Sequence, residues 1–160
     1  MGRVEAICIA PAGSTAMQQV EHIEAIAGVG LAGDRYARGT GFYSERPTDP
    51  GAREVTLIEA ETLEALREQG IELTASEHRR NLTVRGLPLP GLIGTRFTVG
   101  EVVLEGIRDC PPCVHLEEMT GNQRLIQALA SSGGLRARIV VGGTIRVGDP
   151  VTSSVPELTR

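Results

Sequence analysis

The sequence predicts a mostly β domain that closes, or nearly closes, into a β-barrel with two main helices. Most patterned segments are short and rich in Val, Ile and Thr, and several alternate in polarity, as residues 80–85 do. Helical segments are few and do not alternate regularly with the strands, as a βαβ fold would require. A closed barrel leaves no unpaired sheet edge, so we expect it for so many short strands.

Seven segments have the composition of strands. They are residues 4–10, 20–27, 53–58, 81–85, 96–107, 136–141 and 144–147. Gly100 and Glu101 place a turn or a bulge inside the longest of these segments. We therefore expect that segment to form two strand pieces.

The first helical segment spans residues 59–69. Ala60, Leu63 and Leu66 lie on one face of this predicted helix, and Gly70 is its expected end.

Two capping boxes follow along the chain. The sequence Thr-Gly-Asn-Gln at residues 120–123 predicts the start of a second helix, which the glycines at 133–134 end. A weaker capping box at residues 74–77 predicts a short turn.

Length and composition limit the class of protein. The 160 residues suffice for one domain, 1–160. We expect its tail from residue 150 to be frayed, and residues 39–52 to form a mobile loop. A net charge of −4 and 2% aromatic residues argue against a nucleic-acid partner, which needs a basic surface or stacking rings. No segment approaches the roughly 20 apolar residues of a membrane span, so we expect no membrane partner.

The cysteines indicate a reducing compartment. There are three, an odd number, and Cys110 and Cys113 are only three positions apart, which is a poor disulfide framework. The N-terminus shows no continuous apolar run of a signal peptide. We therefore expect a cytoplasmic protein with free thiols.

The candidate reactive segment reads Arg-Asp-Cys-Pro-Pro-Cys-Val-His over residues 108–115. Two prolines stiffen it and remove two backbone donors, so it forms a rigid loop that holds the Cys110 and Cys113 thiols in fixed directions. A thioredoxin-like pair would instead begin a helix after an early strand. A structural zinc site with Cys110, Cys113 and His115 would need a fourth ligand. Both cysteines can also be small buried hydrophobes.

A further interpretation is a reactive thiolate at the bottom of an anion site. Arg108 lies near both thiols in the sequence and favours the thiolate, a soft ligand for metals such as molybdenum and a good sulfur carrier. Arg79 and Arg80 lie where a loop enters a predicted strand. The glycine-rich residues 28–35 allow close backbone approach, and their amides can face an anion.

Five sequence blocks, taken in order, resemble the MOSC domain family, named after the C-terminal domain of molybdenum-cofactor sulfurases. The blocks are Gly-Val-Gly-Leu-Ala-Gly-Asp-Arg-Tyr at 28–36, Arg-Glu-Val-Thr-Leu-Ile-Glu at 53–59, Arg-Arg-Asn-Leu-Thr-Val-Arg-Gly at 79–86, Cys-Pro-Pro-Cys-Val-His-Leu-Glu at 110–117 and Gly-Gly-Thr-Ile-Arg-Val-Gly-Asp at 142–149. The resemblance extends over residues 20–151, and the chain is similar to small stand-alone bacterial members.

The resemblance implies a barrel related to that of pyruvate kinase and a functional cysteine. The family pattern places this cysteine at Cys113, which follows a proline and precedes a short segment that ends in Leu116. The Arg-x-Asn of the family falls on Arg79 and Asn81, which the resemblance implies hold the phosphate or the pterin edge of a cofactor. Arg35 follows the Gly-Asp block, at a position where the family often has a polar residue.

Three functional hypotheses follow. In the first, the protein binds the molybdenum-pterin cofactor with Cys113 as metal ligand and Arg79, Asn81, Arg35 and Arg108 as its basic and polar surroundings. As an enzyme it would then reduce N-hydroxylated small molecules with electrons from a separate electron-transfer partner. In the second, Cys113 accepts a persulfide from a cysteine desulfurase and Cys110 acts as a resolving thiol. The third is a non-catalytic interaction domain whose cysteines only pack.

The resemblance does not extend to the aminotransferase-like domain of the sulfurases. We therefore expect no bound pyridoxal phosphate in this chain.

Overall fold

Strands make up most of the regular structure in a computed structural model of the chain, which describes residues 2–39, 41, 44, 51–74, 77–111, 116, 119–120, 124, 129 and 133–153. The strands of these residues are β1 Gly2–Ile9, β2 Gln18–Val20, β3 His22–Ile26, β4 Gly30–Leu31, β5 Val55–Glu59, β6 Leu82–Arg85, β7 Arg96–Val99, β8 Val102–Asp109, β9 Leu135–Val141, β10 Gly143–Arg146 and β11 Pro150–Thr152. The helices whose full bounds lie within the described residues are α1 Ala60–Glu68 and the short 3-10 helix η1 Pro90–Leu92.

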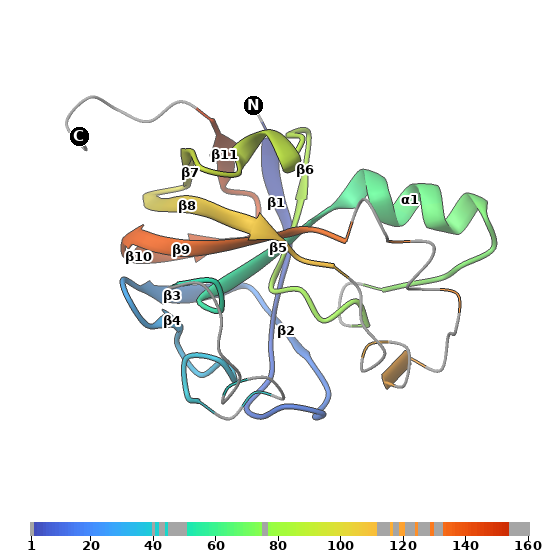
Figure 1. Ribbon diagram of the computed structural model, residues 1–160, viewed down its shortest axis with the longest axis horizontal. Helices are drawn as coiled ribbons and strands as arrows, with labels where there is room; N and C mark the ends of the chain where they lie inside the picture. The colour runs from blue at the N-terminus through green and yellow to red at the C-terminus, as the bar shows by residue number, and fades with distance from the viewer. Residues whose placement is uncertain are drawn as a thin grey trace.

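Seven strands form a closed barrel (Figure 1). Their order around it is β11-β7-β8-β9-β5-β6-β1, and β1 closes the ring by pairing with β11. Neighbouring strands are antiparallel except for β5 and β6, which are parallel. The predicted mostly β fold with a closed barrel is confirmed.

Smaller elements lie outside the ring. β2 pairs with the C-terminal end of β1, and β10, β3 and β4 form a separate three-stranded sheet. In Figure 1, α1 projects on one side of the barrel, while β3 and β4 lie on the other.

Most strands begin and end close to their predicted positions, and the exceptions are short. The segment 96–107 forms β7 and β8 around the expected turn at Gly100 and Glu101. The segment 20–27 divides at Glu21 into the end of β2 and β3, which belong to different sheets. β4, with two residues, and β11, with three, carry too little pattern to be predicted.

β11 corrects the expectation that the chain frays from residue 150. Pro150 and Val151 pair with β1, and Val151 and Thr152 pair with β7, so this strand closes the barrel. Residues 154–160 lie outside the described part of the chain.

Aliphatic side chains and one aromatic ring fill the barrel. Each strand of the ring contributes to a single buried cluster, for example Val4 from β1, Leu57 from β5, Val84 from β6, Phe97 from β7 and Leu104 from β8. With almost no aromatic residues available, close packing of Val, Ile and Leu supplies the apolar burial that stabilises the fold.

The helix α1 ends as the sequence predicts. Gly70 has a φ of +82°, its N–H donates to the Arg67 carbonyl, and the N–H of Ile71 donates to the Leu66 carbonyl. This pair of bonds is a Schellman motif, which favours glycine because of its left-handed backbone. Leu63, Leu66 and Ile71 then pack in a second apolar cluster outside the barrel.

The remaining local predictions have mixed outcomes. The capping turn at 74–77 forms, since the Thr74 N–H donates to the Glu77 carboxylate and the Glu77 N–H to the Thr74 carbonyl. Only parts of the predicted loop 39–52 and of the predicted second helix lie within the described residues. Within that same part of the chain, no helix has both the length and the apolar character needed to cross a bilayer.

Candidate functional site

The glycine-rich segment 28–35 is a hairpin turn that leads to a buried ion pair. The N–H groups of Val29, Ala32 and Asp34 donate to the backbone carbonyls of Ile26, Glu24 and Leu31. These amides are therefore engaged within the turn, and the segment does not offer them to an anion as the sequence suggested. Gly30, with a φ of +137°, brings the turn so close to the residue before β5 that a Cβ would lie 3.0 Å from the Glu54 carbonyl oxygen.

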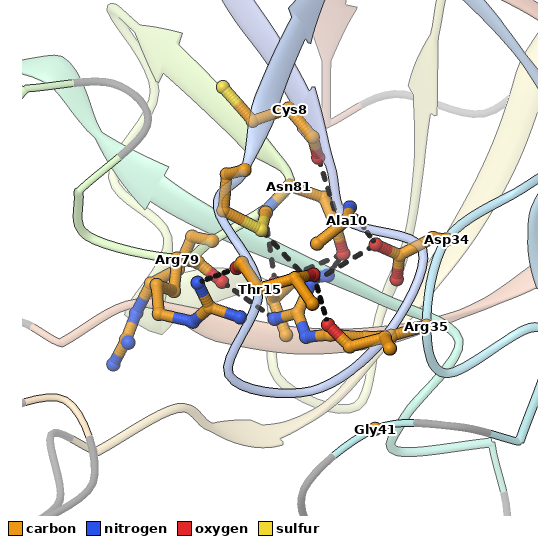
Figure 2. Close-up of polar contacts among 12 residues, drawn as sticks. Cys8, Ala10, Thr15, Asp34, Arg35, Gly41, Arg79 and Asn81 are labelled. Atoms are coloured by element: carbon orange, nitrogen blue, oxygen red, sulfur yellow. Dashed lines mark hydrogen bonds and ion pairs between the residues drawn. The ribbon is translucent and has the colours of Figure 1, made fainter. Parts of the chain in front are cut away.

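Asp34 and Arg35 follow the turn and hold three segments together (Figure 2). Asp34 Oδ1 accepts hydrogen bonds from the Ala10 N–H at 3.1 Å and from Arg35 Nη1 at 3.0 Å. Arg35 Nη1 also lies 3.3 Å from Met17 Sδ, and Arg35 Nη2 donates to the Arg79 carbonyl at 3.0 Å. Arg35 is 6% exposed, so its guanidinium lies beneath the surface and supports Arg79 from inside the protein.

Arg79 has one guanidinium nitrogen engaged and one without a partner. Its Nη1 donates to the Thr15 carbonyl at 2.6 Å, while its buried Nη2 has no hydrogen-bond partner among the described residues. Its backbone φ of +62° is costly for a non-glycine residue. The Arg35 bond to the Arg79 carbonyl supports that conformation.

Burial lowers the pKa of the Arg79 guanidinium, and the charge of Arg35 lowers this pKa further. Tyr36 and Asp34 act in the opposite direction on it. Burial thus disfavours the charged form of Arg79, and the nearby protein groups compensate for this effect only partly.

A pocket of about 270 Å³ lies beside Arg79. Its lining residues come from three separate segments and are Ala16, Met17, Glu77, Arg79, Met119 and Thr120. This volume is just below the roughly 300–1,000 Å³ of typical ligand sites, so the pocket suits one end of a cofactor. The two methionines and Ala16 supply apolar surface, Arg79 supplies positive charge, and Glu77 supplies a carboxylate that accepts a hydrogen bond from the Thr74 N–H.

Asn81 lies next to this site but is engaged within the barrel. Its Oδ1 accepts from the Thr56 N–H at 3.0 Å and from the Thr56 hydroxyl at 3.1 Å, and its Nδ2 donates to the Cys8 carbonyl at 3.1 Å. The side chain therefore connects β5, β6 and β1 just beneath Arg79.

Two neighbouring residues, His78 and Arg80, are also buried. Arg80 is 5% exposed, and its guanidinium donates to four backbone carbonyls, those of His78, Cys110, Pro111 and Gly133. His78 Nδ1 accepts from the Arg80 N–H at 2.9 Å, and its other nitrogen lies 2.9 Å from the Thr83 hydroxyl. Burial, aided by the charge of Arg80, lowers the pKa of His78 to about 3, so this imidazole is neutral near pH 7.

The buried charges do not balance. Among the described residues, those charged near pH 7 and less than a tenth exposed are three arginines, Arg35, Arg79 and Arg80, and one carboxylate, Asp34. We call these four residues the charged cluster. Burying an uncompensated charge is costly, so a cluster with two excess positive charges favours the binding of an anion.

The structure brings some predicted site residues together and separates others. Arg35, Arg79 and Asn81 adjoin one another, whereas Arg108 has a half-exposed side chain at the end of β8, 3.8 Å from the Asp109 carboxylate. Cys110 is buried, and its carbonyl accepts from Arg80. Cys113 and His115 lie outside the described residues.

Several residues of the site were not predicted. Thr15, Met17 and Met119 carry no motif, and Glu77 was noted only for its capping box. Only the fold brings these residues to Arg79. Asp34 had a weak signal, since a carboxylate preceded an arginine after the glycine-rich turn. No group of three or more His, Cys, Asp or Glu side chains suited to a metal occurs within the described residues.

Comparisons with known proteins agree with the observed fold. The sequence profile of the MOSC domain matches residues 33–152. No curated protein sequence matches the chain.

Solved structures share the fold at low sequence identity. The YuaD protein from Bacillus subtilis superposes with a TM-score of 0.78 at 17% identity, over 94% of each chain. YiiM from Geobacillus stearothermophilus gives 0.74 at 16% identity, over 97% of this chain and 76% of the other. YiiM from Escherichia coli gives 0.66 at 17% identity, over 96% and 70%.

Proposed function

Because the chain belongs to the MOSC domain family, which is associated with molybdenum-cofactor binding, we propose that it binds the molybdenum-pterin cofactor at the Arg79 pocket. The observation that carries this proposal is the buried Arg79 guanidinium, with one nitrogen unpartnered among the described residues, at the edge of a pocket. A phosphate is the anionic part of such a cofactor, and arginine is well suited to bind it.

The described residues fit an anionic cofactor at this pocket. The charged cluster, which borders the pocket through Arg79, carries two more positive charges than negative ones. Glu77 adds one carboxylate to the lining, so a net positive charge remains to favour an anion such as a phosphate monoester. Met17 and Met119 provide soft, adaptable apolar surface beside the anion site. Arg35 supports Arg79 from behind, and Asn81 holds the strands beneath it.

We assign the metal-binding thiolate to Cys113. The three cysteines differ in ways that favour this choice. Burial raises the pKa of the Cys8 thiol to about 11, so Cys8 stays protonated near neutral pH. Cys110 is 5% exposed, and its carbonyl accepts a hydrogen bond from Arg80. Cys113 is the position that matches the family's functional cysteine.

When bound, the molybdenum centre supplies two-electron reduction. The proposed reaction takes an N-hydroxylated small molecule, two electrons and two protons to the N–H compound and water, and a separate electron-transfer protein supplies the electrons. The chain's own contribution is to bind the anion through Arg79 and to hold the thiolate ligand.

Metal analysis tests the proposal. Protein produced in a host that makes the cofactor should contain close to one equivalent of molybdenum. We expect Cys113→Ser and Arg79→Met to lower this content at least fivefold. Cys8→Ala is the matched control, because it removes a thiol that cannot ionise near neutral pH, and it should retain wild-type molybdenum.

Less than a tenth of an equivalent in wild-type protein, unchanged in Cys113→Ser, would refute cofactor binding. In that event, incubation with a cysteine desulfurase and cysteine distinguishes the remaining functions by mass spectrometry. An added sulfur atom on Cys113 would indicate a sulfur carrier, and no adduct under anaerobic conditions would indicate an interaction domain.

A further inference from the structure

Arg80, the neighbour of the proposed anion-binding residue, contacts a different part of the chain. Its Nε donates to the Gly133 carbonyl at 2.8 Å, and its Nη2 donates to the carbonyls of Cys110 at 2.9 Å and Pro111 at 3.2 Å. Its Nη1 donates to the His78 carbonyl at 3.0 Å, close to the start of β6.

Three of these four acceptors, the carbonyls of Cys110, Pro111 and Gly133, lie at the two ends of one segment. Cys110 and Pro111 directly follow β8, and Gly133 lies two residues before β9. One guanidinium therefore joins the place where the chain leaves the barrel to the place where it returns. The Cys110 N–H, which donates to the Gly134 carbonyl at 2.9 Å, is the adjacent backbone contact.

From this geometry we infer that Arg80 is a positioning residue that anchors both ends of the segment between Pro111 and Gly133. The segment contributes Met119 and Thr120 to the wall of the Arg79 pocket, and Cys113 belongs to it in the sequence. The consequence of this anchor for cofactor binding rests on the proposed function, whereas the anchor itself does not.

Only arginine can make this set of contacts. Its planar guanidinium presents five N–H donors in a fixed arrangement, whereas lysine is a single charged point on a flexible stem. No carboxylate forms an ion pair with Arg80 in the described part of the chain. Burying a charge that is bonded only to carbonyls contributes little net stability. We therefore assign Arg80 the role of fixing the positions of the carbonyls that it binds.

The other described attachments of the segment constrain it less. Arg124 Nη2 donates to the Gln69 carbonyl at 3.4 Å on the exposed surface. Leu116 and Leu129 pack with Leu66 and Ile58 in the apolar cluster under α1. Apolar packing favours burial but tolerates small displacements, whereas hydrogen bonds fix distance and angle. Arg80 therefore determines where the pocket wall lies relative to Arg79, and the leucines keep the segment attached.

Amide hydrogen exchange of Arg80→Lys tests this anchor. We expect the amides of residues 109, 110 and 116–134 to exchange at least tenfold faster than in wild type, relative to the barrel strands of the same variant. Arg35→Lys is the matched control, because Arg35 is equally buried and also donates to a backbone carbonyl, but that carbonyl belongs to Arg79 and not to Cys110, Pro111 or Gly133. It should instead speed exchange at 10–17 and 79. Should Arg80→Lys not fold, Arg80→Gln removes the buried charge and should show the same local pattern.

Binding of inorganic phosphate, followed by calorimetry, supplies the second readout. Arg80→Lys leaves Arg79 in place, so the dissociation constant should rise at least threefold through displacement of the pocket wall alone. Uniformly faster exchange across the chain, or unchanged exchange at 109–134, would overturn the inference and leave Arg80 a general stabilising residue. If wild-type protein binds no phosphate, the proposed function fails, while the exchange result still decides the anchor.

Discussion

The barrel interior and the charged cluster are both buried, but they are built in opposite ways. The interior consists of aliphatic side chains with Phe97, and its strands satisfy one another's backbone groups around a closed ring. The charged cluster buries three arginines against Asp34, and both Arg79 Nη2 and Asp34 Oδ2 lack hydrogen-bond partners among the described residues.

This difference suggests that the barrel interior provides stability, whereas the charged cluster serves function. An apolar interior gains free energy from every contact, and deleting a contact leaves a cavity. A buried cluster with excess charge and unpartnered polar atoms lowers stability, and binding of an anion offsets that loss. Substitutions in the two regions should therefore change the free energy of unfolding with different magnitudes and, at Arg79, with a different sign.

The largest effect is expected inside the barrel. Phe97→Ala removes the buried ring of β7 and should lower the free energy of unfolding by about 3–5 kcal/mol. Urea unfolding measures this loss, and the affinity of the folded protein for phosphate should be unchanged. A loss below about 1 kcal/mol would contradict the assignment of Phe97 to a tightly packed core.

Asn81 tests a polar residue whose bonds are all internal. Asn81→Ala leaves the Thr56 N–H and the Cys8 carbonyl without their side-chain partner, and we expect a loss of about 2–4 kcal/mol. Gln19→Ala, at an exposed position of β2, is the control and should change stability by less than about 0.5 kcal/mol. Equal stability of both variants in urea would show that Asn81 does not hold the strands together.

His78, which contacts Arg80 of the charged cluster, predicts how the free energy of unfolding responds to acid. Its pKa is about 3 in the folded protein against an ordinary value of 6.5, so between these values the unfolded chain binds more protons. Stability from this residue is therefore fully present above pH 6.5 and is lost as the pH falls toward 3, by at most about 1.4 kcal/mol per pH unit. Urea unfolding of His78→Gln across this pH range should show a shallower acid-side loss than wild type. Parallel pH profiles would mean that His78 does not titrate as its burial requires.

Arg79 should show the smallest change in stability and the reverse sign. Arg79→Met removes a buried, incompletely bonded charge, so in phosphate-free buffer its free energy of unfolding should equal or exceed that of wild type by up to about 1 kcal/mol. Phosphate should raise the Tm of wild type but not of the variant, because only wild type binds the anion. Thermal unfolding with and without phosphate measures both effects. Equal phosphate stabilisation of the two proteins would place the anion elsewhere.

The sequence alone determined the elements whose pattern is local. Residues 59–69 have helical spacing ended by Gly70, and the pairs of strands around Gly100 follow from alternation and a turn, so both were predicted close to their observed limits. The resemblance of five blocks to the MOSC family was also read correctly from the sequence, since order and spacing survive where overall identity to known structures is near 17%. The same resemblance singled out Arg35, Arg79 and Asn81, which the fold brings next to one another, and their role in binding stays a prediction.

Only the tertiary structure decided how these residues divide their tasks. Arg79 and Arg80 are identical neighbours in the sequence, yet one faces a pocket and the other binds carbonyls at both ends of a distant segment. Their environments come from Thr15, Met119, Cys110 and Gly133, which lie far from them along the chain. β11 shows the same limit, because three residues carry no readable pattern and become a strand only through pairing with β1 and β7. Local spacing encodes helices, turns and motifs, whereas contacts between distant segments depend on how the barrel closes.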